Sequence, residues 1–104
     1  MKVLRTPEER FAALAGWPYA PQYAEIDGMR MHYVDEGPRD AQVTALCLHG
    51  EPTWGYLYRK MLPVFTQAGL RVVAPDFFGF GRSDKPDDDA WYSFDSHRAS
   101  LITF

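Results

Sequence analysis

Residues 43–54, which read VTALCLHGEPTW, decide how this chain folds. The part 43–48 is almost continuously apolar, which is typical of a strand covered on both faces in a parallel or mixed sheet. A His-Gly pair follows it, and apolar side chains then recur at helical spacing as far as Ala68. Pro63 interrupts this spacing, so we expect a short turn and then a helix that begins near Met61.

Two further segments extend this stretch into a small sheet. Residues 70–75 form a second buried strand, so residues 43–75 make a β-α-β unit with a right-handed crossover and parallel pairing. Upstream, residues 22–36 form a hairpin around Asp27-Gly28, a dipeptide that suits a type I′ turn because both positions need a positive φ. We therefore expect four strands in the spatial order 1-2-4-3, with the strand before the His-Gly pair at one edge.

The rest of the chain divides into three segments. Residues 1–21 are a lead-in segment, and we expect its aromatic side chains to pin it to a core formed by later residues. Residues 76–92 form a loop that includes a solvated run of aspartates. Residues 93–104 begin a helix, with Ser93 or Asp95 as its N-cap.

Length and composition limit the class of protein. A chain of 104 residues has room for one domain, and its 46% hydrophobic residues favour a packed core. The net charge of −3 offers no footprint for nucleic acid. Cys47 is the single cysteine, and the Asp87–Asp89 run has no spaced partner ligands, so no metal site is expected. No apolar run approaches the ~18 residues of a membrane span, and we expect a soluble, cytoplasmic protein.

Two glycine-bearing loops follow the inner strands at their carboxyl ends, where ligands bind in open α/β sheets. The first, residues 49–52, can present backbone N–H groups to a developing oxyanion, although a plain strand-to-helix connection has the same sequence character. The second, residues 79–83, lacks the Lys-Ser/Thr ending of a phosphate loop and the third glycine of a dinucleotide site. A structural turn is therefore favoured there.

No complete set of catalytic side chains is evident. We interpret His32 in the hairpin and His97 in the last helix as surface or packing residues. His49 is better placed as a base, but no Ser or Asp is positioned beside it as a nucleophile. Ser83 lies in a turn without the strand-to-helix arrangement of a nucleophile elbow. The residues alone thus supply an anion-binding loop and no catalytic set.

Two longer strings carry a family resemblance. HGEPTW at 49–54, followed by YLYRKM at 56–61, resembles the α/β-hydrolase superfamily and, more narrowly, the haloalkane dehalogenases that have Glu after His-Gly. APDFFGFGRSDKP at 74–86 is similar to the same group, and supporting similarity runs from Arg5 to Phe104. A His-Gly pair alone would be weak evidence, but the two strings in this order and spacing are specific.

The resemblance implies a chemistry. In that family an Asp on the elbow after the fifth strand displaces halide from a haloalkane, and a water activated by a His hydrolyses the resulting ester to a primary alcohol. A second acid orients the His, no cofactor is used, and the partners are the small-molecule haloalkane and water.

Of the family's functional positions, the oxyanion-hole residue maps onto Glu51, whose main-chain N–H would stabilise the oxyanion of the second step. His49 and Gly50 would shape the loop. Many relatives carry Asn where this chain has Glu51, and Glu indicates the subgroup in which a Trp of the cap domain helps to bind halide.

The resemblance also bears on the extent of the chain. The sequence stops within what resembles the helix before the fifth strand, so we interpret it as the N-terminal part of an α/β-hydrolase core that is inactive alone. An epoxide hydrolase is an alternative with the same fold, but residues 51–54 argue against it because those enzymes typically carry His-Gly-Phe-Pro. A non-catalytic α/β binding module is an alternative from another class.

Overall fold

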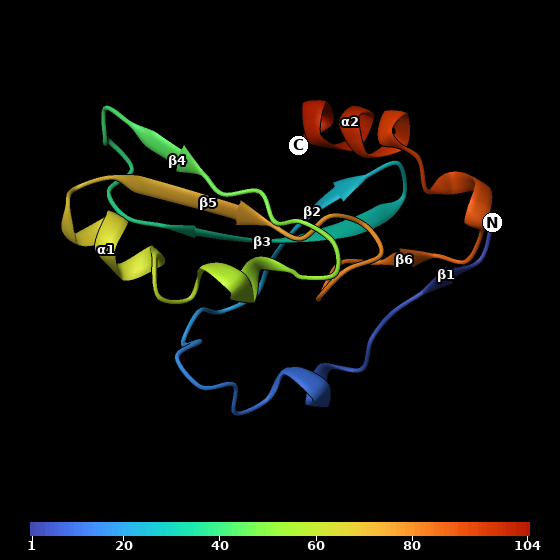
Figure 1. The fold of residues 1–104 in the computed structure, drawn as a ribbon, viewed down its shortest axis with the longest axis horizontal. Coiled ribbons are helices and arrows are strands. Elements are labelled where there is room, and N and C mark those ends of the chain that lie inside the picture. Colours follow the sequence, from blue (N-terminus) through green and yellow to red (C-terminus); the bar gives the residue numbers. More distant parts are fainter.

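A four-stranded mixed sheet lies at the centre of the computed structural model, which describes all of residues 1–104 (Figure 1). In spatial order its strands are β2 (Gln22–Ile26), β3 (Met29–Glu36), β5 (Arg71–Pro75) and β4 (Thr44–Leu46). The pairs β2–β3 and β3–β5 are antiparallel, whereas β4 and β5 run parallel. The predicted order 1-2-4-3, with the strand before the His-Gly pair at one edge, is confirmed.

The hairpin turn between β2 and β3 follows from two residues. Asp27 has φ 53° and Gly28 has φ 78°, so both positions are positive, as a type I′ turn requires. Alternation along β3 then places Met31 on one face of the sheet and Val34 on the other, and both are buried. His32 shares the face of Val34 and is only 1% exposed, so it is a packing residue and not a surface one.

The connection from β4 to β5 has the predicted form of a turn followed by a helix. A 3₁₀ turn at Gly55–Tyr58 precedes α1 (Leu62–Gln67), which carries Pro63 in its first turn. Leu62 is fully buried against the face of the sheet that β5 presents through Val72 and Ala74. The core on this side consists of Trp17, Val34, Cys47, Leu62, Val72 and Ala74.

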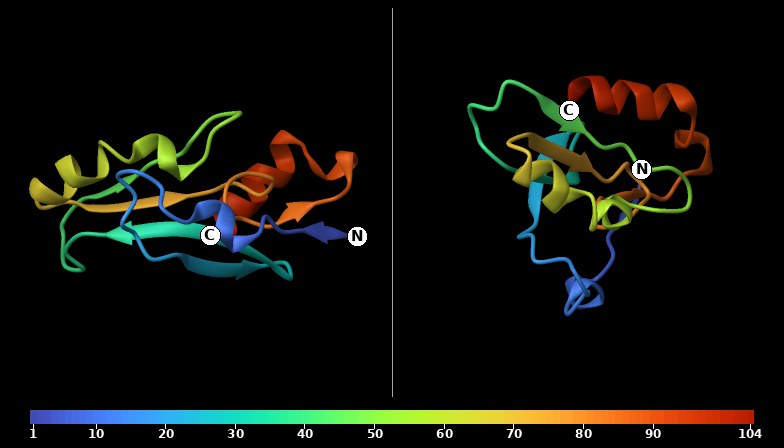
Figure 2. Two further views of the ribbon diagram at one scale, coloured as in Figure 1. Left: turned by 90° about the horizontal axis from the view of Figure 1, so that it is seen from below. Right: turned by 60° about the vertical axis from the view of Figure 1, so that its left-hand side comes forward.

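The second helix, α2 (Phe94–Thr103), lies on the other side of the sheet from α1 (Figure 2). Its N-cap is Ser93, whose Oγ accepts a hydrogen bond from the Ser96 N–H at 3.1 Å, so Ser93 and not Asp95 takes this role. A smaller core on this side consists of Ile26, Met29, Met31 and Phe78.

The edge strand β4 is less covered than its sequence predicts. Its apolar character predicts burial on both faces, but Val43 beside it is 58% exposed and Leu46 is 52% exposed. The cause is its position, because β4 pairs only with β5 and α2 leaves its outer face open (Figure 1).

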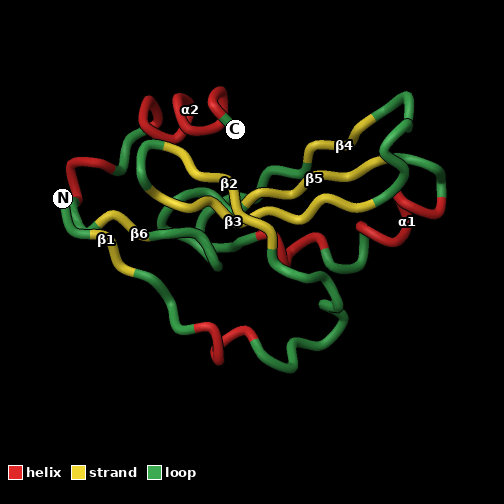
Figure 3. Tube along the Cα trace, turned by 180° about the vertical axis from the view of Figure 1, so that it is seen from behind, coloured by secondary structure: helices red, strands yellow, loops and turns green.

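The first residues of the chain lie along the outside of this core. β1 (Val3–Leu4) pairs antiparallel with β6 (Lys85–Pro86), and this second, two-stranded sheet is visible at one end of the molecule (Figure 3). The Arg5 guanidinium donates two hydrogen bonds to the buried Asp84 carboxylate, at 2.7 and 3.0 Å. Trp17 enters the core, 9% exposed and with its ring centroid 5.4 Å from that of Trp54.

Candidate functional site

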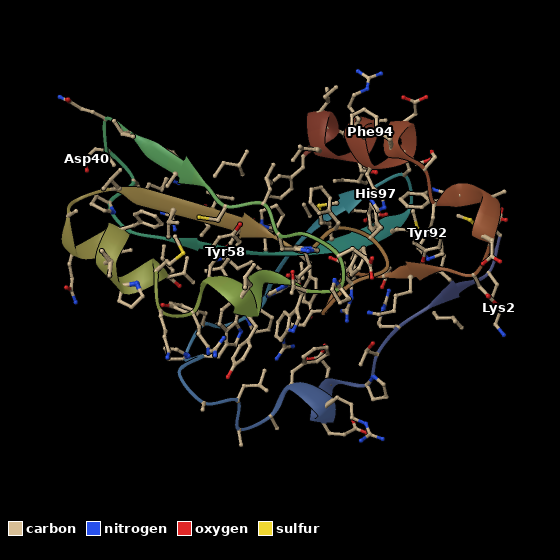
Figure 4. The ribbon with its side chains drawn as sticks, in the orientation of Figure 1. Lys2, Asp40, Tyr58, Tyr92, Phe94 and His97 are labelled. Atoms are coloured by element: carbon tan, nitrogen blue, oxygen red, sulfur yellow. The ribbon has the colours of Figure 1, made fainter.

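A cavity of about 650 Å³ opens where β4 and β5 end. Its walls come from residues 48–51 after β4, from Phe77 and Phe80 after β5, and from α2 together with the two residues before it. Figure 4 shows His97 and Tyr92 of that third wall between α2 and the strands. The walls are mainly apolar, and the carboxyl ends of parallel strands are where α/β sheets bind ligands.

The peptide unit between Gly50 and Glu51 is the polar feature of this cavity. The Gly50 carbonyl oxygen accepts hydrogen bonds from His49 Nδ1 at 2.9 Å, from the Thr53 N–H at 3.0 Å and from Thr53 Oγ1 at 2.7 Å. Because a trans peptide is planar, its N–H points away from its C=O. The Glu51 N–H therefore points away from these three donors, and it has no acceptor within the chain.

His49 fixes the position of the same loop. Its Nε2 lies 2.9 Å from the backbone nitrogen of Phe77, whose N–H can only donate, so Nε2 is the acceptor and the ring proton sits on Nδ1. That Nδ1–H donates to the Gly50 oxygen. Both ring nitrogens are thus bonded to backbone groups, which leaves neither of them free to take a proton from a substrate. The structure places His49, Gly50 and Glu51 together at the cavity.

A fully buried carboxylate holds the far end of this loop. Asp76 Oδ1 accepts the Gly55 N–H at 2.7 Å, while Oδ2 accepts the Arg82 N–H at 3.0 Å and lies 2.8 Å from His32 Nδ1. Ser83 Oγ donates to the Asp76 carbonyl and accepts the His32 N–H. One carboxylate therefore joins β3, the end of the loop after β4 and the turn after β5.

The glycine-bearing turn after β5 is built around Asp76. Gly81 has φ +53°, and a Cβ at this position would lie 2.4 Å from Asp76 Oδ2. Only glycine fits there, because a side chain would displace the carboxylate. This supports the interpretation of residues 79–83 as a structural turn.

His97 forms part of the wall contributed by α2. Its ring lies among Phe77 and Trp91, with centroid separations of 5.6 and 5.3 Å, and its Nδ1 is buried without a hydrogen-bond partner. Burial lowers the pKa of His97, and the nearby His49 lowers it further. The side chain is therefore neutral near pH 7 and packs against the cavity.

Several other chemically interesting groups are not brought to the cavity. Asp87–Asp89 are exposed, and no group of three or more His, Cys, Asp or Glu side chains is close enough to hold a metal ion. Cys47 is buried, and burial raises the pKa of its thiol. None of the helices has the length and apolar surface needed to cross a bilayer.

Sequence reasoning identified neither Asp76 and His32 as a buried pair nor Thr53 as a double donor to the Gly50 oxygen. A signal for Asp76 was present, since an ionisable residue directly follows the buried strand β5. A signal for Thr53 was its place three residues after a glycine in a turn, where threonine can bond the backbone. For His32 the pairing partner is 44 residues away, and no local pattern reveals it.

The strand order and the site together define a class of protein. An antiparallel hairpin beside a parallel β-α-β unit, with a backbone donor after a His-Gly turn, is the arrangement expected of an α/β-hydrolase core. A family model described as alpha/beta hydrolase fold matches residues 45–104. The chain belongs to the α/β-hydrolase fold family, which confirms the predicted fold class.

Within this family, two curated relatives with high sequence identity are haloalkane dehalogenases. Such an enzyme from Psychrobacter cryohalolentis is 54% identical over 102 residues, covering 93% of this chain and 33% of its own length. One from Mycobacterium marinum is 51% identical over 102 residues, with coverages of 93% and 34%. The chain therefore spans about a third of the length of the curated relatives it matches.

Among solved structures, a haloalkane dehalogenase is more similar to this chain than an epoxide hydrolase is. The tetrameric haloalkane dehalogenase of Paraglaciecola agarilytica NO2 is 62% identical, with a TM-score of 0.95 over 98% of this chain and 36% of that one. An epoxide hydrolase from Vigna radiata is 26% identical, with a TM-score of 0.72 over 81% of this chain and 27% of that one. The predicted resemblance to haloalkane dehalogenases is confirmed, and the epoxide hydrolase alternative is not favoured.

Proposed function

We propose that this chain forms the N-terminal part of the core of a haloalkane dehalogenase, in which the Glu51 N–H stabilises an oxyanion. The observation that carries the proposal is the Glu51 N–H itself, which lacks an acceptor in the chain and belongs to a wall of the apolar cavity. The identity of 51–62% to haloalkane dehalogenases supports the same reaction class.

The proposed reaction has two steps. In the first, an Asp carboxylate attacks the carbon that bears the halogen, a C–O bond forms as the carbon–halogen bond breaks, and halide leaves. In the second, a water gives a proton to a His and attacks the ester carbonyl, and negative charge collects on the carbonyl oxygen. Collapse of this intermediate breaks the bond between the carbonyl carbon and the alkyl oxygen, which takes the remaining proton of the water and leaves as a primary alcohol, while the carboxylate is regenerated and the His gives its proton to solvent. The Asp, the His and the acid that orients the His are supplied by residues outside these 104.

This chain contributes to the second step through its backbone. The Glu51 side chain is exposed, so its carboxylate remains in water while its N–H is the group available to the cavity. An N–H fixed in an apolar, water-poor site stabilises a developing oxyanion more strongly than it would in bulk water. The same apolar walls suit a haloalkane, which has few groups that accept hydrogen bonds, and the proposed reaction needs no cofactor.

A chimera tests the proposal. Residues 1–104 replace the matching segment of the Paraglaciecola agarilytica enzyme, and halide release from a bromoalkane is measured with purified protein. We expect halide release well above a buffer control. As a control, the matching segment of the Vigna radiata epoxide hydrolase is placed in the same host, where we expect no release. A chimera that folds, as judged by its circular dichroism and thermal unfolding, yet releases no halide would contradict the proposal.

A further inference from the structure

We propose that Thr53 is a positioning residue that aims the Glu51 N–H at the oxyanion. This inference rests on the proposed function, since it assigns the group that orients the proposed donor. Thr53 donates to the Gly50 carbonyl oxygen twice, from its N–H at 3.0 Å and from its hydroxyl at 2.7 Å. The Gly50 C=O and the Glu51 N–H belong to one planar peptide, so a group that holds the carbonyl also fixes the direction of the N–H.

Packing does not hold this peptide. Gly50 is exposed, and a Cβ built on it would meet no atom within 4 Å. By contrast, a Cβ on Gly55 would lie 3.0 Å from Asp76 Oδ1, so the chain around Gly55 is tightly enclosed. The hydrogen bonds to the Gly50 oxygen are therefore the contacts that prevent the peptide from rotating about its flanking bonds.

Thr53 is well placed to be the fixed partner in these bonds. Two residues further on, the Gly55 N–H is bonded at 2.7 Å to the fully buried Asp76 carboxylate. The Thr53 hydroxyl makes no other hydrogen bond within the chain, so its proton is committed to the Gly50 oxygen. Asp76 thus holds Gly55, and the short backbone from Gly55 back to Thr53 places the two donors that bond the Gly50 oxygen.

The two steps of the proposed reaction allow an experiment to distinguish a loss of positioning from general structural damage, because the two steps depend differently on the Glu51 N–H. Displacement of halide develops no charge on a carbonyl oxygen, whereas hydrolysis of the ester does. A misdirected Glu51 N–H should therefore slow only the second step. The ester would accumulate, and rapid mixing with a bromoalkane would show a burst of halide followed by slow steady turnover.

The test uses the chimera described above and substitutions at Thr53. Thr53→Val keeps the shape of the side chain and loses the hydroxyl, while Thr53→Ser and Thr53→Ala form a second pair that differs only in the hydroxyl. We expect Thr53→Val and Thr53→Ala to reduce kcat on the order of tenfold with an unchanged burst rate, because the donor is displaced and not removed. Thr53→Ser should behave like the parent chimera. If Thr53→Val fails to fold, the serine and alanine pair decides the result.

Thr66 provides a matched control within the same chain. Its hydroxyl donates to the Pro63 carbonyl three residues earlier, at 3.2 Å, near the end of α1, and Thr66 does not line the cavity. Thr66→Val should leave both steps unchanged. Equal slowing of both steps in Thr53→Ala, or no slowing of either, would overturn the inference while leaving an active parent chimera in place. An inactive parent chimera would instead count against the proposed function.

Discussion

The Nε2 atom of His49 accepts a hydrogen bond from the backbone N–H of Phe77 at 2.9 Å, and this bond joins the loop after β4 to the loop after β5. The ring of His49 also packs edge-on against that of Phe77, with centroids 5.1 Å apart. Both ring nitrogens of His49 are therefore bonded to the backbone of the cavity wall, and the donor that we propose for the oxyanion is the Glu51 N–H.

Replacing Glu51 by proline in the chimera should abolish the donor without altering a side chain that the proposed reaction uses. Removal of one oxyanion donor typically costs about 10²- to 10³-fold in kcat, and we expect a loss of this size in the ester-hydrolysis step. Glu51→Gln keeps the N–H and should stay within about threefold of the parent, because a surface carboxylate is all that it changes. Rapid-mixing and steady-state halide assays measure the rate of ester hydrolysis in each variant. Similar losses in the two variants would show that the side chain, and not the backbone, matters.

Gly81→Ala should destabilise the fold. The new Cβ would stand 2.4 Å from Asp76 Oδ2 and 2.8 Å from the Trp54 Cβ, at a backbone φ of +53° that side chains rarely adopt. A loss of about 2 kcal/mol is expected from the clash and the backbone strain together. Gly50→Ala is the control, since its Cβ meets no atom within 4 Å and should cost less than about 1 kcal/mol. Thermal unfolding compares the chimera carrying Gly81→Ala with the chimera carrying Gly50→Ala. Equal unfolding temperatures would contradict the steric argument.

The parts of the fold that the sequence predicts are those with local causes. The turn at Asp27-Gly28 depends on two adjacent residues, and the start of the helix near Pro63 depends on the ring of that proline, which suits the first turn of a helix. Neither needs knowledge of distant segments. The β-α-β unit follows from two apolar runs and the spacing between them.

What the sequence does not predict depends on contacts between distant residues. His32 pairs with Asp76 across 44 residues, and Arg5 pairs with Asp84 across 79 residues. Each of these side chains, taken alone, resembles an ordinary surface residue, because burial of a charged group is decided by a partner that local patterns do not name. The two-residue strands β1 and β6 were missed for the same reason, since only their mutual pairing makes them strands.

Acid should loosen the attachment of the lead-in segment to the core. Burial tends to raise the pKa of Asp84, but hydrogen bonds from Arg5 and from the Arg30 N–H outweigh it and lower the pKa below its ordinary value. The unfolded carboxyl therefore binds its proton at a higher pH than the folded one. The stability from this group is complete above the ordinary pKa of about 3.9 and is lost as the pH falls through the folded pKa.

The matching experiment follows the free energy of unfolding of the chimera in urea between pH 6 and pH 2, values chosen to span the ordinary carboxyl pKa. Asp84→Asn should be less stable near pH 6 and should lose less stability on acidification, because this carboxyl no longer titrates. Asp95→Asn removes a carboxylate whose side chain is 88% exposed and should leave the pH dependence unchanged. An Asp84→Asn curve parallel to that of the parent would contradict the linkage.

The 104-residue chain studied by itself should self-associate and should release no halide from a bromoalkane. β4 pairs only with β5, so the N–H and C=O groups along its other side are unpaired. Leu46, 52% exposed, and the neighbouring Val43, 58% exposed, add an apolar surface to this open edge. Natural proteins protect such edges with charges, prolines or bulges, and none of these interrupts residues 43–48.

A charge placed on the edge should prevent this association. Leu46→Lys places an ammonium group on the open edge strand, where pairing with a second strand would bring like charges together and remove water from them, and we expect it to shift the chain from aggregates toward monomer in analytical ultracentrifugation. Val64→Lys is the matched control, because Val64 is 63% exposed but lies on α1, away from any strand edge, and it should leave association unchanged. If the unmodified chain is instead a monomer that melts reversibly in a single two-state transition, the open edge is harmless. That result would favour the non-catalytic α/β module over the dehalogenase core.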